Sequence, residues 1–198
     1  MPLIAALLVV VALIAAARDW ADRAISQPPG VLAPAEPLQR DIEAPVFTLD
    51  RYRLRTRARF AVKARVLSGE RYRLARGAHL MPRDLALGWG IMSDSNTLDS
   101  LSITQSDRWY YVKARGDRLP IPSEMITTNS ANMHLIAANP TIARLIDHVR
   151  VGEIVEFEGM LVDVEMPNGA LWRTSLSRTD TGAGACETVY VERFDIRH

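Results

Sequence analysis

The stretch RYRLRTRARFAVKARV, residues 51–66, alternates basic and uncharged side chains over its whole length. Seven of its eight odd-numbered positions are Arg or Lys, and none of its even-numbered positions is charged. A period of two is typical of a β-strand with one face in the core, because successive side chains point to opposite faces. The stretch therefore predicts a strand with a row of cations on its exposed face. Since most strands have 3 to 10 residues, we expect a bend, a bulge or two strands here.

The charges of the chain are unevenly distributed. In total, 24 Lys and Arg nearly balance 23 Asp and Glu, which argues against a protein devoted to nucleic acid. Lys and Arg outnumber Asp and Glu by 12 to 4 in residues 40–83, whereas acidic residues lead by 9 to 4 in residues 151–198. The cationic row thus has an acidic candidate neighbour, and facing opposite charges stabilise strand pairs. We expect Arg55, Arg57 or Arg59 to lie beside Glu153, Glu156 or Glu158.

The N-terminal segment LIAALLVVVALIAAA, residues 3–17, is apolar without interruption. As a helix it would span about 22 Å at 1.5 Å per residue, which is short of a bilayer core of roughly 30 Å. Residues 1–20 come closer, with Trp20 as an interfacial anchor. A cleaved signal peptide is the alternative, because Ala15-Ala16-Ala17 supplies a small-residue cleavage site. We predict a single-pass anchor in a bacterial inner membrane, with the domain on the periplasmic side.

Residues 21–43 contain QPPGVLAPAEPLQ, in which four of thirteen residues are proline. This composition is typical of an extended spacer. The alternative is a tail that packs along the surface of the domain. We expect the remaining residues, 44–198, to form a single globular domain.

Several segments predict the elements of that domain. MPRDLALGWG (residues 81–90) predicts a short helix with proline in its first turn and glycine at its end. Asn139 and Pro140 are typical of the start of a helix. The other predicted elements are a turn at 68–70 with a return strand from 71, a strand at 106–114, a hairpin of 153–165 and 170–177, and a last strand at 186–194. The pattern indicates an α+β domain: a curved antiparallel sheet or a small OB-like β-barrel with two or three short helices, preceded by the N-terminal apolar helix.

Three residues are candidates for catalysis. Cys186, the lone cysteine, would form a nucleophile and base pair with His134, and Asp180 begins the Asp-Thr-Gly-Ala tetrapeptide of retroviral-type aspartic proteases. The alternatives are a buried structural thiol and a Gly-rich turn in which Asp180 bonds the local chain. The four histidines show no short ligand spacing, so neither a metal nor a cofactor is expected.

Two aromatic positions are candidates for binding. Trp89 lies between two glycines and close to Asp94, in a pattern common in binding loops, and Trp109 is followed by two tyrosines. Aromatic platforms suit sugar and peptide ligands as well as bases. The alternative is that Trp89 packs into the core beside a helix end.

Three phrases are similar to a known group of proteins. They are DLALGWGIMSD (84–94), SANMHLIAA (130–138) and SLSRTDTGAGACE (175–187), and they follow PPGVLAP (28–34). Together they resemble a family of uncharacterised bacterial proteins with an N-terminal membrane segment, a Pro-rich spacer and one extracytoplasmic domain. The resemblance implies an anchor and a single domain, and it implies no activity.

The sequence favours a membrane-tethered periplasmic binding or assembly module without catalysis of its own, with a protein partner in the cell envelope. One alternative is a hydrolase or thiol enzyme that uses Cys186 with His134 or Asp180. Another is an anion-binding module that holds lipid head groups or nucleic acid on the basic face of residues 51–65, although the near-neutral net charge disfavours nucleic acid.

Overall fold

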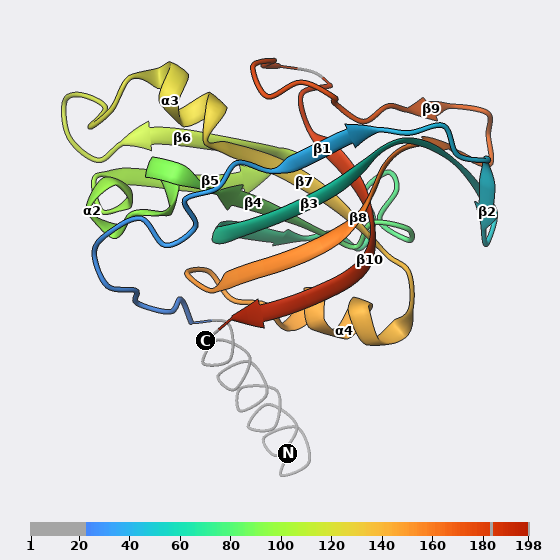
Figure 1. Ribbon diagram of the computed structural model, residues 1–198, viewed down its shortest axis with the longest axis horizontal. Coiled ribbons are helices and arrows are strands. Elements are labelled where there is room, and N and C mark those ends of the chain that lie inside the picture. Colours follow the sequence, from blue (N-terminus) through green and yellow to red (C-terminus); the bar gives the residue numbers. More distant parts are fainter. Residues whose placement is uncertain (1–22, 183, 198) are drawn as a thin grey trace, which may run out of the picture.

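The computed structural model describes residues 23–182 and 184–197 (Figure 1). The predicted membrane anchor, residues 1–20, lies outside this range. Within the range, no helix has both the length and the apolar character needed to cross a membrane. The α+β class is confirmed, since the described chain is mostly strands with a few short helices, but the main sheet is mixed rather than purely antiparallel.

Five strands pair in a closed circuit. They are β3 (Tyr52–Arg71), β4 (Arg83–Gly88), β7 (Ser130–Ala137), β10 (Glu187–Arg197) and β8 (Ile154–Glu165). In that order each strand pairs with the next, and β8 returns to β3. Four of the contacts are antiparallel, and the contact of β7 with β10 is parallel. A closed circuit leaves these strands few unpaired edges and encloses a core.

Strand β3 confirms the predicted alternation of buried and exposed side chains. Its buried side chains alternate with exposed ones from Tyr52 to Phe60, and it runs unbroken for 20 residues. The expected irregularities are present as register shifts, one at Arg57 against β8 and one at Leu67 against β4. The turn predicted at 68–70 is wrong, because β3 continues through Gly69 to Arg71 and the following loop occupies residues 72–82.

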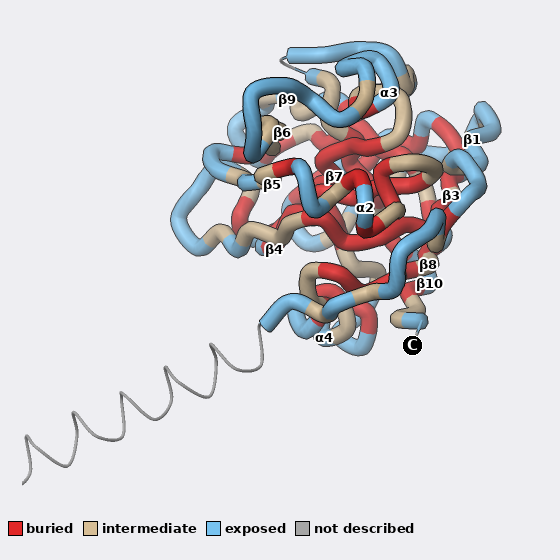
Figure 2. Tube along the Cα trace, turned by 90° about the vertical axis from the view of Figure 1, so that its left-hand side faces the viewer, coloured by how far each residue is buried: buried red, intermediate tan, exposed pale blue. Residues whose placement is uncertain are grey.

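Aliphatic and aromatic side chains fill the circuit. Phe60, Leu85, Leu135, Phe157 and Val189 belong to one buried cluster that draws on all five strands. The helix α4 (Pro140–His148) adds apolar side chains to this cluster and closes one end of the barrel (Figures 1 and 2). Its N-cap is Asn139, whose side chain accepts from two backbone N–H groups, as the sequence predicts.

A hairpin and short helices lie between β4 and β7. The chain passes through η1 (Gly90–Ser93), α2 (Ser95–Leu98), β5 (Leu101–Ser106), β6 (Trp109–Ala114) and α3 (Ser123–Thr128). β5 and β6 form a separate two-stranded sheet, which packs through a further buried cluster that includes Ala86 of β4 and Leu101 of β5.

The helix predicted at residues 81–90 is wrong. This segment is β4, and all six of its residues are buried. A strand that is covered on both faces loses the alternation that identifies a half-buried strand. The same reason explains why the sequence gives no strand signal for β7, which is also buried on both faces.

The Pro-rich segment lies along the barrel. β1 (Leu38–Asp41) pairs with β3, and so does β2 (Phe47–Leu49). Further back, Ile25 donates its N–H to the carbonyl of Val151 at 2.7 Å. The packed part of the chain therefore begins well before residue 44. The short strand β9 (Leu171–Trp172) completes the sheet beside β8, in the predicted hairpin.

Candidate functional site

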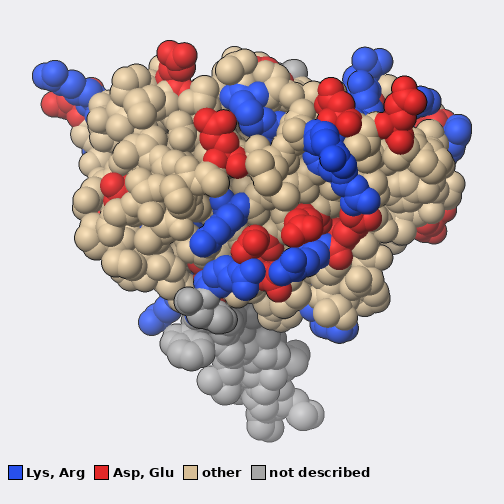
Figure 3. All heavy atoms as spheres, viewed as in Figure 1, with Lys and Arg blue, Asp and Glu red and all other residues tan. Residues whose placement is uncertain are grey.

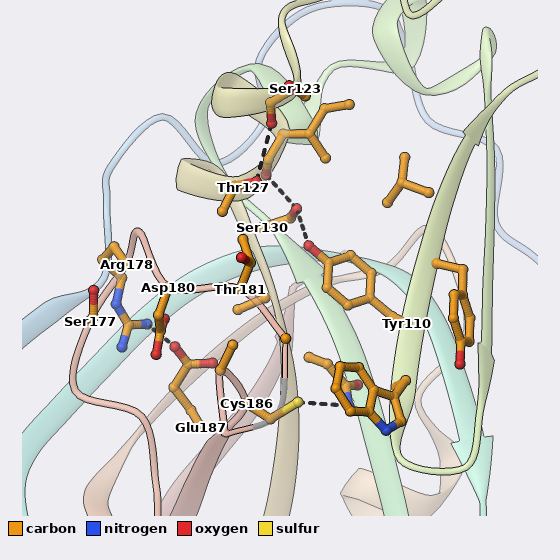
Figure 4. Close-up of a pocket in the computed structure, with 18 of the residues that line it drawn as sticks. Tyr110, Ser123, Thr127, Ser130, Ser177, Arg178, Asp180, Thr181, Cys186 and Glu187 are labelled. Carbon is orange, nitrogen blue, oxygen red and sulfur yellow. Dashed lines mark hydrogen bonds and ion pairs between the residues drawn. The ribbon is translucent and has the colours of Figure 1, made fainter.

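A groove lies beside the β5–β6 hairpin. Its walls are β6, α3, the first residues of β7, and residues 177–182 and 185–187 before and at the start of β10. Its volume is about 370 Å³. It gathers residues from segments far apart in the sequence, and Figure 4 shows Tyr110 on one side of it, with Arg178, Asp180 and Glu187 on the other.

The hairpin is fixed in place by a buried arginine. Asp107 and Arg108 form its two-residue turn, with φ angles of 52° and 70°, as a type I′ turn requires. The Arg108 guanidinium donates to Asp84 at 2.7 Å and lies 3.9 Å from the centre of the Tyr72 ring. A buried charge that is paired and stacked in this way holds its segment rigidly. The wall formed by β6 is therefore anchored to β4.

Aromatic side chains form the wall on the side of β6. Trp109 is 39% exposed and Tyr111 is 43% exposed, which is unusual for large aromatic residues. Tyr110 points to β7, where its hydroxyl lies 3.0 Å from the Ser130 hydroxyl. Burial raises the pKa of Tyr110, although the hydrogen bond with Ser130 lowers it. The phenol is therefore neutral at ordinary pH.

The opposite wall is polar and contains a buried ion pair. Glu187 is 1% exposed, and its Oε1 lies 2.5 Å from Nη1 of Arg178. Burial raises the pKa of Glu187 to about 7, although the Arg178 charge lowers it. Asp180 accepts a hydrogen bond from the Ser175 hydroxyl at 2.7 Å and has no ion-pair partner among the described residues.

The sequence did not identify Arg178 or Glu187 as site residues. A signal for Glu187 was present, because it has the same parity as Val189 and Val191, which point into the core. A carboxylate at the next inward position of such a strand is expected to be buried and paired.

Of the predicted catalytic residues, the structure brings Cys186 and Asp180 to the groove but not His134. The Cys186 thiol contacts Asn132 Nδ2 at 3.6 Å and the Arg108 carbonyl at 3.7 Å. His134 Nδ1 instead lies 2.9 Å from Asp84, and His134 does not line the groove. Burial raises the pKa of Cys186 to about 11. The thiol therefore stays protonated at neutral pH, whereas a nucleophile needs the thiolate.

Of the predicted binding residues Trp89, Asp94 and Trp109, the two tryptophans lie at the groove and Asp94 does not. Trp109 and Trp89 both line it, but Trp89 is 1% exposed and donates its indole N–H to the Thr128 carbonyl at 3.2 Å. Asp94 caps α2 and accepts the N–H of Gly30 at 2.8 Å. Trp109 is thus the accessible platform, whereas Trp89 and Asp94 support the fold.

Three of the seven cations in the β3 row form ion pairs with acidic residues of the described chain. The expected neighbour is right, because β3 pairs with β8, but the expected partners are wrong. Arg55 lies opposite Asp163 and Arg59 opposite Met160. The ion pairs join Arg53 to Glu165, Arg57 to Asp163 and Arg59 to Glu192.

The difference in partners arises from the register. The antiparallel pairing with a bulge at Arg57 brings the end of β8, rather than its start, beside Arg53–Arg57. Glu156 and Glu158 instead pair with Arg197 and Arg193 of β10. Figure 3 shows acidic and basic side chains interleaved on this face. A face of mixed charge is a poor site for a polyanion.

A second hollow of about 500 Å³ lies between the loop 72–82, β7 and α4. Its wall includes Arg83, whose guanidinium donates to the carbonyls of Ile146, Asp147 and Val149 at 2.5 to 2.7 Å. These bonds satisfy the last carbonyls of α4. Arg83 therefore has a structural role in the wall of this hollow.

Among residues 23–182 and 184–197, no group of three His, Cys, Asp or Glu side chains is placed to hold a metal ion. The resemblance to an uncharacterised bacterial family stays a prediction: comparisons of the chain with protein-family models, with curated proteins and with solved structures found no match.

Proposed function

We propose that this protein is a binding module without catalysis of its own, and that it holds its partner in the groove beside β6. The observation that carries the proposal is the composition of the groove. Accessible aromatic rings of Trp109 and Tyr111 line one side, and polar groups of Arg178 and Asp180 line the other. Sites of mainly apolar lining with a few polar groups are typical of ligand recognition.

The barrel supports this proposal by its topology. A five-stranded circuit in which the third and fifth strands are parallel resembles an OB-type barrel, a fold that binds ligands on its second and third strands and the adjoining loops. Here those strands are β4 and β7, and the β5–β6 hairpin packs on them. The groove lies at the margin of that covered face, and the loop between the fourth and fifth barrel strands, β8 and β10, forms one of its walls.

Two further predictions belong to the same proposal. The apolar segment of residues 3–17 would tether the module to a bacterial inner membrane, with the barrel in the periplasm, and the partner would be a protein of the envelope. Against a thiol enzyme, the raised pKa of Cys186 disfavours its thiolate, and His134 pairs with Asp84 and does not act as its base.

Site-specific photocrosslinking in native membranes tests the proposal. A benzophenone amino acid replaces Tyr111 at the groove in one full-length variant, and Leu74 in a matched control. Leu74 is fully exposed in the loop 72–82, away from the groove. We expect a defined adduct from position 111 and none from position 74. Equal labelling at both positions, or none at position 111, would show that the groove does not hold a partner.

A further inference from the structure

One edge of β6 has no partner. In the hairpin, Ser106 faces Trp109 and Thr104 faces Tyr111. After a two-residue turn these are the hydrogen-bonded pairs, so the N–H and C=O groups of Tyr110 and Val112 point away from β5. Among the described residues, no backbone or side-chain group bonds to them. Such a row of donors and acceptors is a template for another strand.

The groove follows this edge. Four consecutive residues of β6, 109–112, line it. Because neighbouring side chains of a strand lie on opposite faces, a hollow that all four residues touch lies beside the strand rather than over one face. The opposite wall includes the start of β7, where Ser130–Asn132 extend beyond β10, whose pairing begins at Met133.

We propose that an extended segment of the partner protein adds to β6 as a third strand and lies in the groove. This inference rests on the proposed binding function and names its mode. Main-chain hydrogen bonds to Tyr110 and Val112 supply the affinity, and pockets for alternate side chains supply the selectivity. The four lining residues of β6 correspond to about 13 Å of strand, which accommodates three or four residues of the partner.

The walls of the groove determine which side chains suit the segment. Leu119, Ile126 and Val112 give the groove an apolar side, so an aliphatic or aromatic side chain is expected to enter it. Arg178 is already paired with Glu187, whereas Asp180 has no ion pair among the described residues. Asp180 therefore favours a Lys or Arg in the segment. A saccharide would stack on Trp109 but would not match unpaired backbone groups at strand spacing.

Peptide binding to the full-length chain in detergent tests strand addition. The probes are fluorescein-labelled hexapeptides that alternate threonine with valine, leucine or phenylalanine and carry one lysine. We expect saturable binding by fluorescence anisotropy. N-methylation of the amides that would face β6 should weaken binding at least tenfold, whereas N-methylation of the alternate amides should leave it unchanged, because only the first set donates to the edge.

A matched pair of variants tests the edge from the side of the protein. V112P removes the outward N–H of Val112 but no bond to β5, since proline is tolerated on edge strands, and V112A removes only side-chain atoms. V112P should reduce affinity at least tenfold, with a thermal unfolding curve that shows the fold is kept, and V112A should reduce it less than threefold.

Other outcomes would overturn the inference in distinguishable ways. Binding that is insensitive to both N-methylation patterns excludes strand pairing, and so does the absence of binding by every probe at millimolar concentration. If position 111 still crosslinks to a partner, the binding function stands and its mode is different. If position 111 crosslinks only to a saccharide, or only to a second copy of this chain, that molecule and not a segment of a partner protein occupies the groove.

Discussion

Glu187 makes the stability of the protein depend on pH. Burial raises its pKa from an ordinary 4.5 to about 7, so between these values the folded state binds more protons than the unfolded state. Its contribution is fully present below about pH 4.5 and is lost as pH rises through 7. At 1.36 kcal/mol per pKa unit, this loss is about 3 kcal/mol. We expect urea unfolding to show this decline between pH 4.5 and 7.5, and E187Q to remove it.

The exposed Glu36 provides the control for this measurement. E36Q makes the same Glu-to-Gln change at a residue that is exposed on the surface, so a decline that is lost in E187Q and kept in E36Q is assigned to the buried position. The same decline in E187Q as in the parent protein would show that another group causes it. E187Q also leaves the Arg178 charge without a carboxylate. The free energy of unfolding of E187Q at one pH is therefore a separate question from how that free energy changes with pH.

At the scale of elements, the sequence identifies strands and helices with one exposed face and misses those with none. The alternation of residues 51–66 is visible because cations occupy the exposed face of β3, and α4 is visible because Asn139 and Pro140 mark its start. β4 and β7 have no polar face to reveal their period.

The groove residues Trp109, Asp180 and Cys186 could be named individually, but their proximity depends on the parallel pairing of β7 with β10, which no local pattern encodes.

The contact of β8 with β10 depends on a glycine. A Cβ at Gly159 would lie 2.0 Å from the carbonyl oxygen of Tyr190, and backbone on a paired strand cannot move away without loss of ladder hydrogen bonds. We expect G159A to destabilise the fold by about 1–3 kcal/mol, the usual cost of overpacking, measured by urea unfolding. In G116A the new methyl has nothing within 4 Å and should change stability by less than about 0.5 kcal/mol. Equal stability of the two variants would contradict the close approach of β8 to β10 at Gly159.

At the scale of the whole molecule, the Pro-rich segment is a strap across the barrel. The Ser95 hydroxyl donates to the carbonyl of Gln27, the N–H of Gly30 donates to Asp94, and β1 pairs with β3. Proline composition predicts an extended backbone, which the segment has, but it does not say whether that backbone is solvated or bound. The side chains that bind it come from η1 and α2, about 60 residues further along the chain. Because of this separation in sequence, no local pattern predicts the contact.

Ser93 binds the backbone of this strap at two consecutive residues. Its hydroxyl is fully buried, accepts the N–H groups of Leu32 and Ala33 at 3.1 and 3.0 Å, and donates to the Gly90 carbonyl at 2.7 Å. S93A leaves these groups unpaired, which costs about 1–3 kcal/mol for a buried group. We expect faster amide hydrogen exchange at residues 32 and 33 in S93A, with the core strands still protected. S102A, which removes a hydroxyl without a partner among the described residues, should leave exchange there unchanged. Unaltered protection at residues 32 and 33 in S93A would mean that the backbone bond from Gly90 to Ala33 holds the strap without the serine.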